Sequence, residues 1–277
     1  MDLIYVLSGE ELYNRALIFK QKQDYDTYII YITMAANYGY PDAIDNIYKC
    51  NTYKKQNYTV TKNFYETTAL NNNMANAYSV HFLAYMYENG LGVKLDYIKA
   101  IALYKISINK GCHYSSFNLA DKYENGIGCE TDYNKAIELY EVAIKKGIIE
   151  ALTNLGSLYF NRSDGNKDYV KTKYFYKKAI KKGETTALNN LACLYINGLG
   201  CKKNYSKAIY YYEKAIESGN ISKLNDLILI YKNNMHADYD KIIKLYNIGI
   251  SVHDLTSIIG LKILLRIDNL ETEISMT

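Results

Sequence analysis

Three glycine pairs, each separated by one residue, are the first feature of this chain that could do chemistry. They lie in YENGLGV (87–93), YENGIGC (123–129) and YINGLGC (195–201). A glycine-rich loop can cradle phosphates, but the dinucleotide fingerprint needs a third glycine and occurs once, between a strand and a helix. Leu95, Thr131 and Lys203 stand where that third glycine would be. The glycines therefore indicate architecture rather than a nucleotide site.

The glycine pairs recur at a fixed interval, which is the signature of a repeat protein. Gly90 and Gly126 are 36 residues apart, and Gly198 follows 72 residues after Gly126. In the second unit Leu119, Ala120 and Tyr123 have the spacing of one helical face. This pattern predicts a first helix, helix A, that ends at glycines in the left-handed conformation.

A second helix, helix B, follows the glycine turn in each unit. Its predicted N-caps are Asp96, Asp132, Asp168 and Asn204. The pattern K-A-I-x-x-Y-x-x-A-I-x-x-G, as at 135–147, then runs to a glycine that ends the helix. Four such units run in register without a gap over residues 79–222.

These motifs resemble the Sel-1-like repeat, a relative of the tetratricopeptide repeat. The resemblance implies an all-α fold, a right-handed superhelical α-solenoid of antiparallel helix-turn-helix repeats with a period of 36. We expect residues 1–277 to form a single repeat domain. Its predicted parts are two degenerate N-terminal repeats (1–78), four regular repeats (79–222), a degenerate repeat (223–256), and a C-terminal capping helix and tail (257–277).

Composition argues against several other classes of protein. The formal net charge is +4, too small to indicate nucleic-acid binding by itself. No apolar run approaches the roughly 20 residues of a membrane-spanning helix, and the N-terminus lacks the basic region of a signal peptide. The five cysteines form no C-x-x-C, and the family's secreted members carry a cysteine pair in each repeat, which this chain lacks. We therefore expect a cytoplasmic or other intracellular location.

Neither a catalytic constellation nor a metal site emerges from the sequence. The four histidines, His81, His113, His236 and His253, have no second ligand at helical spacing. No G-x-S-x-G, H-E-x-x-H or Walker motif occurs. We predict a protein that is not an enzyme and that needs no cofactor.

The side of helix A opposite its core stripe is the most informative surface. In the tetratricopeptide relatives this side lines a concave groove where partners bind, and the resemblance implies the same here. We call this set the A-helix surface: Tyr78, His81, Tyr85, Glu88, Tyr114, Phe117, Asp121, Glu124, Ser157, Phe160 and Asn189, with Glu150, Thr153, Thr186, Cys193 and Ile196 completing it. Exposed aromatic and acidic residues are typical of peptide-binding surfaces. The alternative is that Tyr78, Tyr85 and Phe117 pack against the next repeat.

The functional prediction is a non-enzymatic adaptor or scaffold that binds a protein or peptide partner in that groove. The alternative is nucleic-acid binding through a lysine-rich convex face of the B helices. Its lysines are Lys171, Lys173, Lys177, Lys178, Lys181 and Lys182. Acidic residues interrupt the ridge in neighbouring units, so a solvated face is the favoured interpretation and nucleic acid is not the expected partner.

Overall fold

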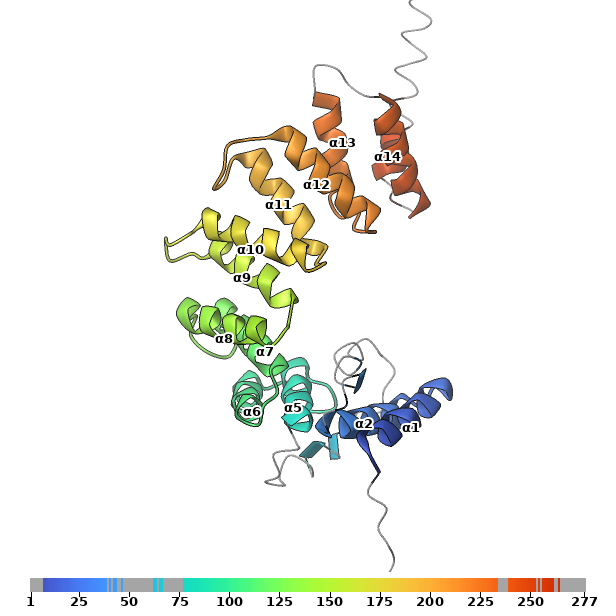
Figure 1. Ribbon diagram of the computed structural model, residues 1–277, viewed down its shortest axis with the longest axis vertical. Coiled ribbons are helices and arrows are strands. Elements are labelled where there is room, and N and C mark those ends of the chain that lie inside the picture. Colours follow the sequence, from blue (N-terminus) through green and yellow to red (C-terminus); the bar gives the residue numbers. More distant parts are fainter. Residues whose placement is uncertain are drawn as a thin grey trace, which may run out of the picture. The chain divides into compact units, whose positions relative to one another are not determined.

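The structure is a computed structural model. It describes residues 7–38, 77–233 and 239–252 without a break, together with residues 40, 42, 43, 46, 62, 63, 65, 66, 254, 256–261 and 264. The structure describes twelve α-helices from end to end between residues 9 and 251, residues 256–261 are helical as well, and no strand occurs among the described residues (Figure 1). His236, His253 and Cys50, which the sequence analysis considered, lie outside the described residues.

The helices follow one another as short antiparallel pairs. The first pair is α1 (Gly9–Gln21) and α2 (Tyr25–Asn37). The A helices of the four regular repeats are α5 (Ala77–Asn89), α7 (Tyr114–Asn125), α9 (Glu150–Asn161) and α11 (Thr186–Asn197). Their B helices are α6 (Tyr97–Asn109), α8 (Tyr133–Lys145), α10 (Tyr169–Lys181) and α12 (Tyr205–Glu217). The last pair is α13 (Leu224–Asn233) and α14 (Tyr239–Ser251). The prediction of an all-α solenoid of helix pairs with a 36-residue period is confirmed.

The chain divides into two compact units, Met1–Ala151 and Leu152–Thr277. Unit 1 holds α1, α2 and α5 to α8, and unit 2 holds α10 to α14 with nearly all of α9. The proposed grouping of all residues into one repeat domain, with degenerate repeats at both ends, stays a prediction.

The predicted N-caps begin the four B helices. The side chains of Asp96, Asp132, Asp168 and Asn204 accept hydrogen bonds from backbone N–H groups three residues on, at 2.9, 3.0, 2.9 and 2.8 Å. Each such bond satisfies an amide that the first helical turn leaves without a partner. The sequence prediction of these four helix starts is confirmed.

The two glycines of each turn have different structural roles. Gly126 and Gly198 end α7 and α11 in the left-handed conformation, with φ of 66° and 70°. The second glycine allows a close approach to the preceding repeat: a Cβ on Gly128 would lie 2.4 Å from Cβ of Tyr97, and a Cβ on Gly200 would lie 2.5 Å from the backbone of Tyr169. The glycine pairs are therefore structural at both positions.

A buried tyrosine from helix B fills the centre of each regular repeat. Tyr104, Tyr140, Tyr176 and Tyr212 are at most 3% exposed. A small residue on helix A makes room for each ring, as at Gly156, where a Cβ would lie 2.8 Å from the ring of Tyr176. These rings bury large apolar areas, and their hydroxyl groups need partners. The partners lie on the A-helix surface.

Candidate functional site

The hydroxyl groups of the buried tyrosines reach side chains of the A-helix surface in all four repeats. Tyr104 donates to Oε2 of Glu88 at 2.5 Å, and Tyr140 donates to Oε2 of Glu124 at 2.8 Å. In unit 2 the corresponding partners are Ser157, 3.0 Å from the Tyr176 hydroxyl, and Cys193, 3.2 Å from the Tyr212 hydroxyl. The core thus holds specific polar side chains of the A-helix surface in place.

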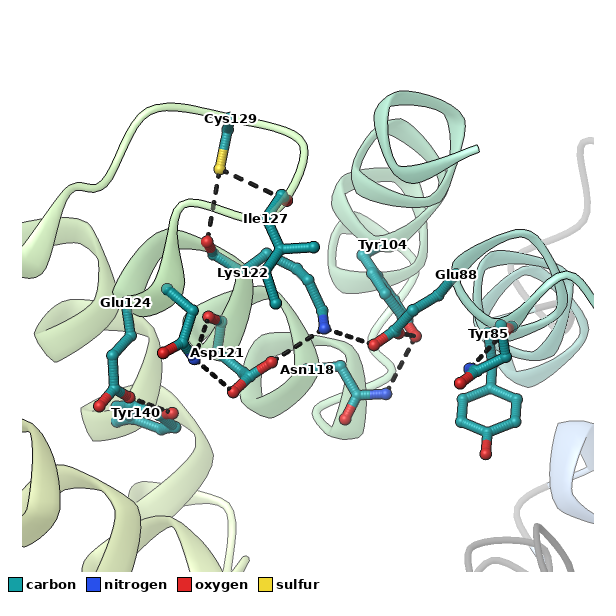
Figure 2. A network of polar contacts seen from close by, with 12 residues as sticks. Tyr85, Glu88, Tyr104, Asn118, Asp121, Lys122, Glu124, Ile127, Cys129 and Tyr140 are labelled. Atoms are coloured by element: carbon teal, nitrogen blue, oxygen red, sulfur yellow. Dashed lines mark hydrogen bonds and ion pairs between the residues drawn. The ribbon is translucent and has the colours of Figure 1, made fainter. Parts of the chain in front are cut away.

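In unit 1 a lysine on α7, Lys122, extends the Tyr104–Glu88 contact into a network (Figure 2). Nζ of Lys122 forms an ion pair with Oε1 of Glu88 on α5 and lies 2.8 Å from Oδ2 of Asp121. Asn118 donates to the hydroxyl of Tyr104 at 3.0 Å, and so extends the network to α6. Three helices therefore meet at one cluster of acidic, amide and phenol groups.

The ammonium of Lys122 is buried, because its side chain is only 7% exposed. Burial lowers the pKa of this lysine, but hydrogen bonds to Asp121 and Glu88 more than offset that effect, so its pKa is raised. Burial raises the pKa of Glu124, against a hydrogen bond from Tyr140 that lowers it. Burial and the nearby Glu88 raise the pKa of Tyr104 well above its usual value. The phenol stays protonated as a donor.

The sequence predicted eleven principal residues of the A-helix surface, and the structure leaves most of them partly accessible. The half-buried ones are Tyr78, Tyr85, Glu88, Tyr114, Phe117, Asp121, Glu124, Ser157 and Phe160. The ring of Phe117 also contacts the ring of Tyr140, with centroids 5.9 Å apart. Glu88 and Asp121 come together at Lys122, and Glu124 is bonded separately to Tyr140. Ser157, Phe160 and Asn189 belong to unit 2.

Three of the predicted surface residues are buried, namely His81, Asn189 and Thr153, the last at 7% exposed, and this corrects their assignment. His81 is 1% exposed and Asn189 is 4% exposed. Nδ1 of His81 lies 2.9 Å from Oγ of Ser115, the small residue at the start of the next A helix. Asn189 donates to Oδ1 of Asn220 at 3.1 Å and to Oγ of Ser222 at 2.9 Å. These partners lie in the next A helix, as Ser115 does in α7, or just before it, as Asn220 and Ser222 do before α13. A view of one isolated helix does not include them.

The sequence analysis missed Lys122. The same repeat position holds Met86 in α5, Leu158 in α9 and Leu194 in α11, all of them buried. A lysine among three buried apolar residues is a signal visible in the aligned repeats. Lys and Glu are almost never fully buried without a partner, so the substitution itself indicates a nearby carboxylate.

The lysines of the alternative site lie on α10 and at its C-cap, Lys182. Nζ of Lys171 lies 3.7 Å from the carboxylate of Asp168, and Nζ of Lys173 donates to the carbonyl of Gly200 at 2.7 Å. In the described residues, Lys177, Lys178, Lys181 and Lys182 form no ion pair.

Metal-binding clusters and membrane-spanning helices are both absent from the described part of the chain. No group of three or more His, Cys, Asp or Glu side chains is placed to hold a metal ion there. Among the same residues, no helix has the length and apolar character required to cross a membrane. Cys112, Cys129, Cys193 and Cys201 are free thiols.

Comparisons with known proteins agree with this geometry. The family model described as Sel1 repeat matches residues 77–112, 113–148, 149–184 and 185–220, just over half of the chain. These matches have the predicted period and begin two residues before the units read from the sequence. No curated protein matches the chain.

Solved structures share the fold. A Sel1 repeat protein from Oxalobacter formigenes has a TM-score of 0.60 and 23% identity, covering 78% of this chain and 86% of that protein. A protective antigen of uropathogenic Escherichia coli with an SLR fold has a TM-score of 0.53 and 20% identity. That match covers 90% of this chain and 63% of the antigen. At these identities the similarity shows the fold alone.

Proposed function

Because the chain belongs to the Sel1 repeat family, we propose that it is a non-enzymatic adaptor that binds a protein or peptide segment on its A-helix surface. Sel1 repeat proteins are generally protein-interaction scaffolds. We assign the anchor of this binding to the part of the surface on α5 and α7, which we call the α5–α7 surface: Tyr85, Glu88, Phe117, Asp121 and Glu124.

The Lys122 network is the observation that carries the proposal. A buried ion pair is weak evidence for stability, since apolar residues of similar volume are often as stabilising. Three other repeats of this chain hold such apolar residues at the same position: Met86, Leu158 and Leu194. The network instead fixes Glu88 and Asp121 in defined positions, and a preorganised surface loses less entropy when a partner binds.

The charge of the α5–α7 surface indicates what kind of segment it fits. Two carboxylates, from Glu88 and Asp121, contact the single ammonium of Lys122, and the carboxylate of Glu124 accepts a hydrogen bond from Tyr140 instead. The half-buried rings of Tyr85 and Phe117 supply apolar area beside them. Aromatic anchors surrounded by polar groups are typical of interface hot spots. A segment with an apolar side chain flanked by Lys or Arg complements this surface.

A random 12-residue peptide library displayed on phage tests the proposal against the intact chain. We expect the selected sequences to carry basic residues next to an apolar residue. A synthetic peptide from the selection should bind Phe117→Ala roughly thirtyfold more weakly, since truncating a hot-spot aromatic costs about 2 kcal/mol or more. Ile137→Ala on the B helix α8, a half-buried residue outside the A-helix surface, provides a matched truncation that should leave affinity unchanged.

Two results would contradict the proposal. One is a selection that enriches no sequence on the folded chain. The other is a selected peptide whose affinity is unaffected by Phe117→Ala and by Glu88→Gln, with both variants shown by circular dichroism to retain helicity.

A further inference from the structure

Helix α10 carries the largest uncompensated positive charge among the regular B helices. Its sequence, YVKTKYFYKKAIK, contains no acidic residue. Lys177, Lys178, Lys181 and Lys182 have no ion-pair partner among the described residues, and together with Tyr174 they line an open hollow of about 580 Å³. Lysines at a helix C-terminus interact favourably with the helix dipole, but that effect is confined to the last turn and does not account for Lys177.

An aromatic ring is presented beside these lysines. Tyr174 is 57% exposed, and its ring is held edge-on against Phe175 with centroids 5.1 Å apart. Phe175 in turn stacks on Tyr159 of α9 at an interplanar angle of 3°. Nζ of Lys178 lies 5.8 Å from the centroid of the Tyr174 ring. The Tyr174 ring is therefore held in position by Phe175 while more than half of the residue is exposed to solvent.

The equivalent positions of α8 show that the repeat fold does not require this surface. Where α10 has Tyr174, Lys177 and Lys178, α8 has Glu138, Glu141 and Val142. Both helices keep the last two lysines, which are Lys145 and Lys146 in α8. The exposed tyrosine recurs in α12 as Tyr210, held edge-on against Tyr211, but Glu213 and Glu217 stand there in place of Lys177 and Lys181. The combination of this ring with a run of lysines is therefore particular to α10 and exceeds what the shared scaffold uses.

We propose that this α10 face, defined by Tyr174, Lys177, Lys178, Lys181 and Lys182, binds a short single-stranded segment of nucleic acid. Non-specific single-strand binders combine basic side chains that follow the phosphates with aromatic rings on which bases stack. A paired duplex keeps its bases stacked on one another, so an exposed ring on the surface of a helix does not reach them. Membrane-surface helices present large aliphatic or aromatic residues for insertion, whereas this face presents one tyrosine among four lysines.

The dimensions of the α10 face limit the size of the ligand. Residues 174–182 span about 12 Å at 1.5 Å per residue. A stacked strand with about 3.4 Å between phosphates places three or four phosphates along this distance. Each lysine can therefore neutralise about one phosphate. This inference does not depend on the proposed peptide surface, which lies on α5 and α7.

Fluorescence anisotropy with labelled 12-nucleotide oligouridylate and oligothymidylate, on the intact chain, tests the inference and separates RNA from DNA. Four phosphate contacts predict a slope of about −2.8 for log affinity against log salt, or roughly fiftyfold weaker binding at 200 mM than at 50 mM salt. Lys181→Gln with Lys182→Gln should reduce the slope to about −1.4. Tyr174→Ala should weaken binding by roughly five- to a hundredfold, and Tyr174→Phe should retain it.

The matched control is Lys145→Gln with Lys146→Gln, which removes the same charge from the same repeat position in α8. This control should leave the affinity and the salt slope unchanged. The inference is overturned by any of three results: no binding at 50 mM salt, equal weakening by the two lysine pairs, or tighter binding to phosphatidylserine vesicles than to the oligonucleotides. Circular dichroism of each variant excludes loss of folding as the cause.

Discussion

Helices α8 and α10 occupy the same place in consecutive repeats, yet their exposed faces differ in charge. Both begin at an aspartate N-cap and both bury a central tyrosine, Tyr140 or Tyr176. Their exposed positions differ, with Glu138 and Glu141 on α8 and Tyr174 and Lys177 on α10. The repeat fixes the buried and capping residues and leaves the surface free to vary. One scaffold can therefore carry different binding surfaces on different repeats.

The A helices show the same contrast at a buried position. Lys122 of α7 replaces the leucine that α9 and α11 carry as Leu158 and Leu194. The replacement is possible because Glu88 and Asp121 are close enough to pair with the ammonium. Unit 1 thus carries a polar network where the A helices of unit 2 are apolar. This difference can be tested by replacing the polar network around Lys122 with the apolar residue that α9 and α11 carry.

The largest expected effect comes from removing both partners of Lys122. Glu88→Ala with Asp121→Ala leaves a buried, unpaired ammonium, which should reduce the free energy of unfolding by about 3 kcal/mol or more. Adding Lys122→Leu, the residue of α9 and α11, should recover most of that loss. Urea denaturation of the wild type, the double variant and the triple variant measures the loss and the recovery of the free energy of unfolding. If the triple variant is no more stable than the double variant, then α7 is not interchangeable with the apolar A helices.

Both units should depend on the close approach of a turn glycine to the first tyrosine of the preceding B helix. Gly128→Ala in unit 1 and Gly200→Ala in unit 2 should each destabilise by about 2–4 kcal/mol, because they combine left-handed strain with overpacking against Tyr97 or Tyr169. Gly147→Ala is the control, since its φ is 94° but no atom lies within 4 Å of the added Cβ. It should cost only about 1–2 kcal/mol. Thermal unfolding of the three variants checks this order. Equal losses at all three glycines would mean that the close contact adds nothing.

The smallest effect concerns acid sensitivity and belongs to unit 1. Burial lowers the pKa of His81 to about 3. Below pH 6.5 the unfolded chain therefore binds a proton that the native chain does not, and stability falls as the pH drops toward 3. This histidine should make the protein about 2 kcal/mol less stable at pH 5 than at pH 8. His81→Asn can keep a hydrogen bond to Ser115 and should remove that part of the difference. An unchanged pH dependence in His81→Asn, measured by urea denaturation, would show that His81 is accessible to protons in the native state.

Local signals in the sequence were sufficient to predict where the helices of the regular repeats begin and end. An N-cap such as Asp132 and a terminal glycine such as Gly126 act within a few residues, so their pattern predicts helix ends directly. The 36-residue period then predicts the helix pairs, because every unit buries the same positions. For these reasons the fold class follows from the sequence alone.

The details of the site depend on neighbouring repeats and were only partly predictable. A helical wheel placed His81 and Asn189 outward, but they are buried in contact with Ser115 in α7 and with Ser222 just before α13. Lys122 was missed because its partner Glu88 lies 34 residues earlier in the chain. Comparing equivalent positions across the repeats, rather than reading each helix alone, would have revealed the lysine.

The central claim is that α5–α7 and α10 carry two separate binding surfaces on one scaffold. A crossed titration tests it most directly: the phage-selected peptide and the oligouridylate are each measured against Phe117→Ala with Tyr85→Ala, and against Lys181→Gln with Lys182→Gln. The account predicts that the aromatic variant loses about thirtyfold in peptide affinity and binds the oligonucleotide as the wild type does. The lysine variant should bind the oligonucleotide more weakly and bind the peptide as the wild type does. Loss of both ligands in one variant, or of neither ligand in both, would contradict it.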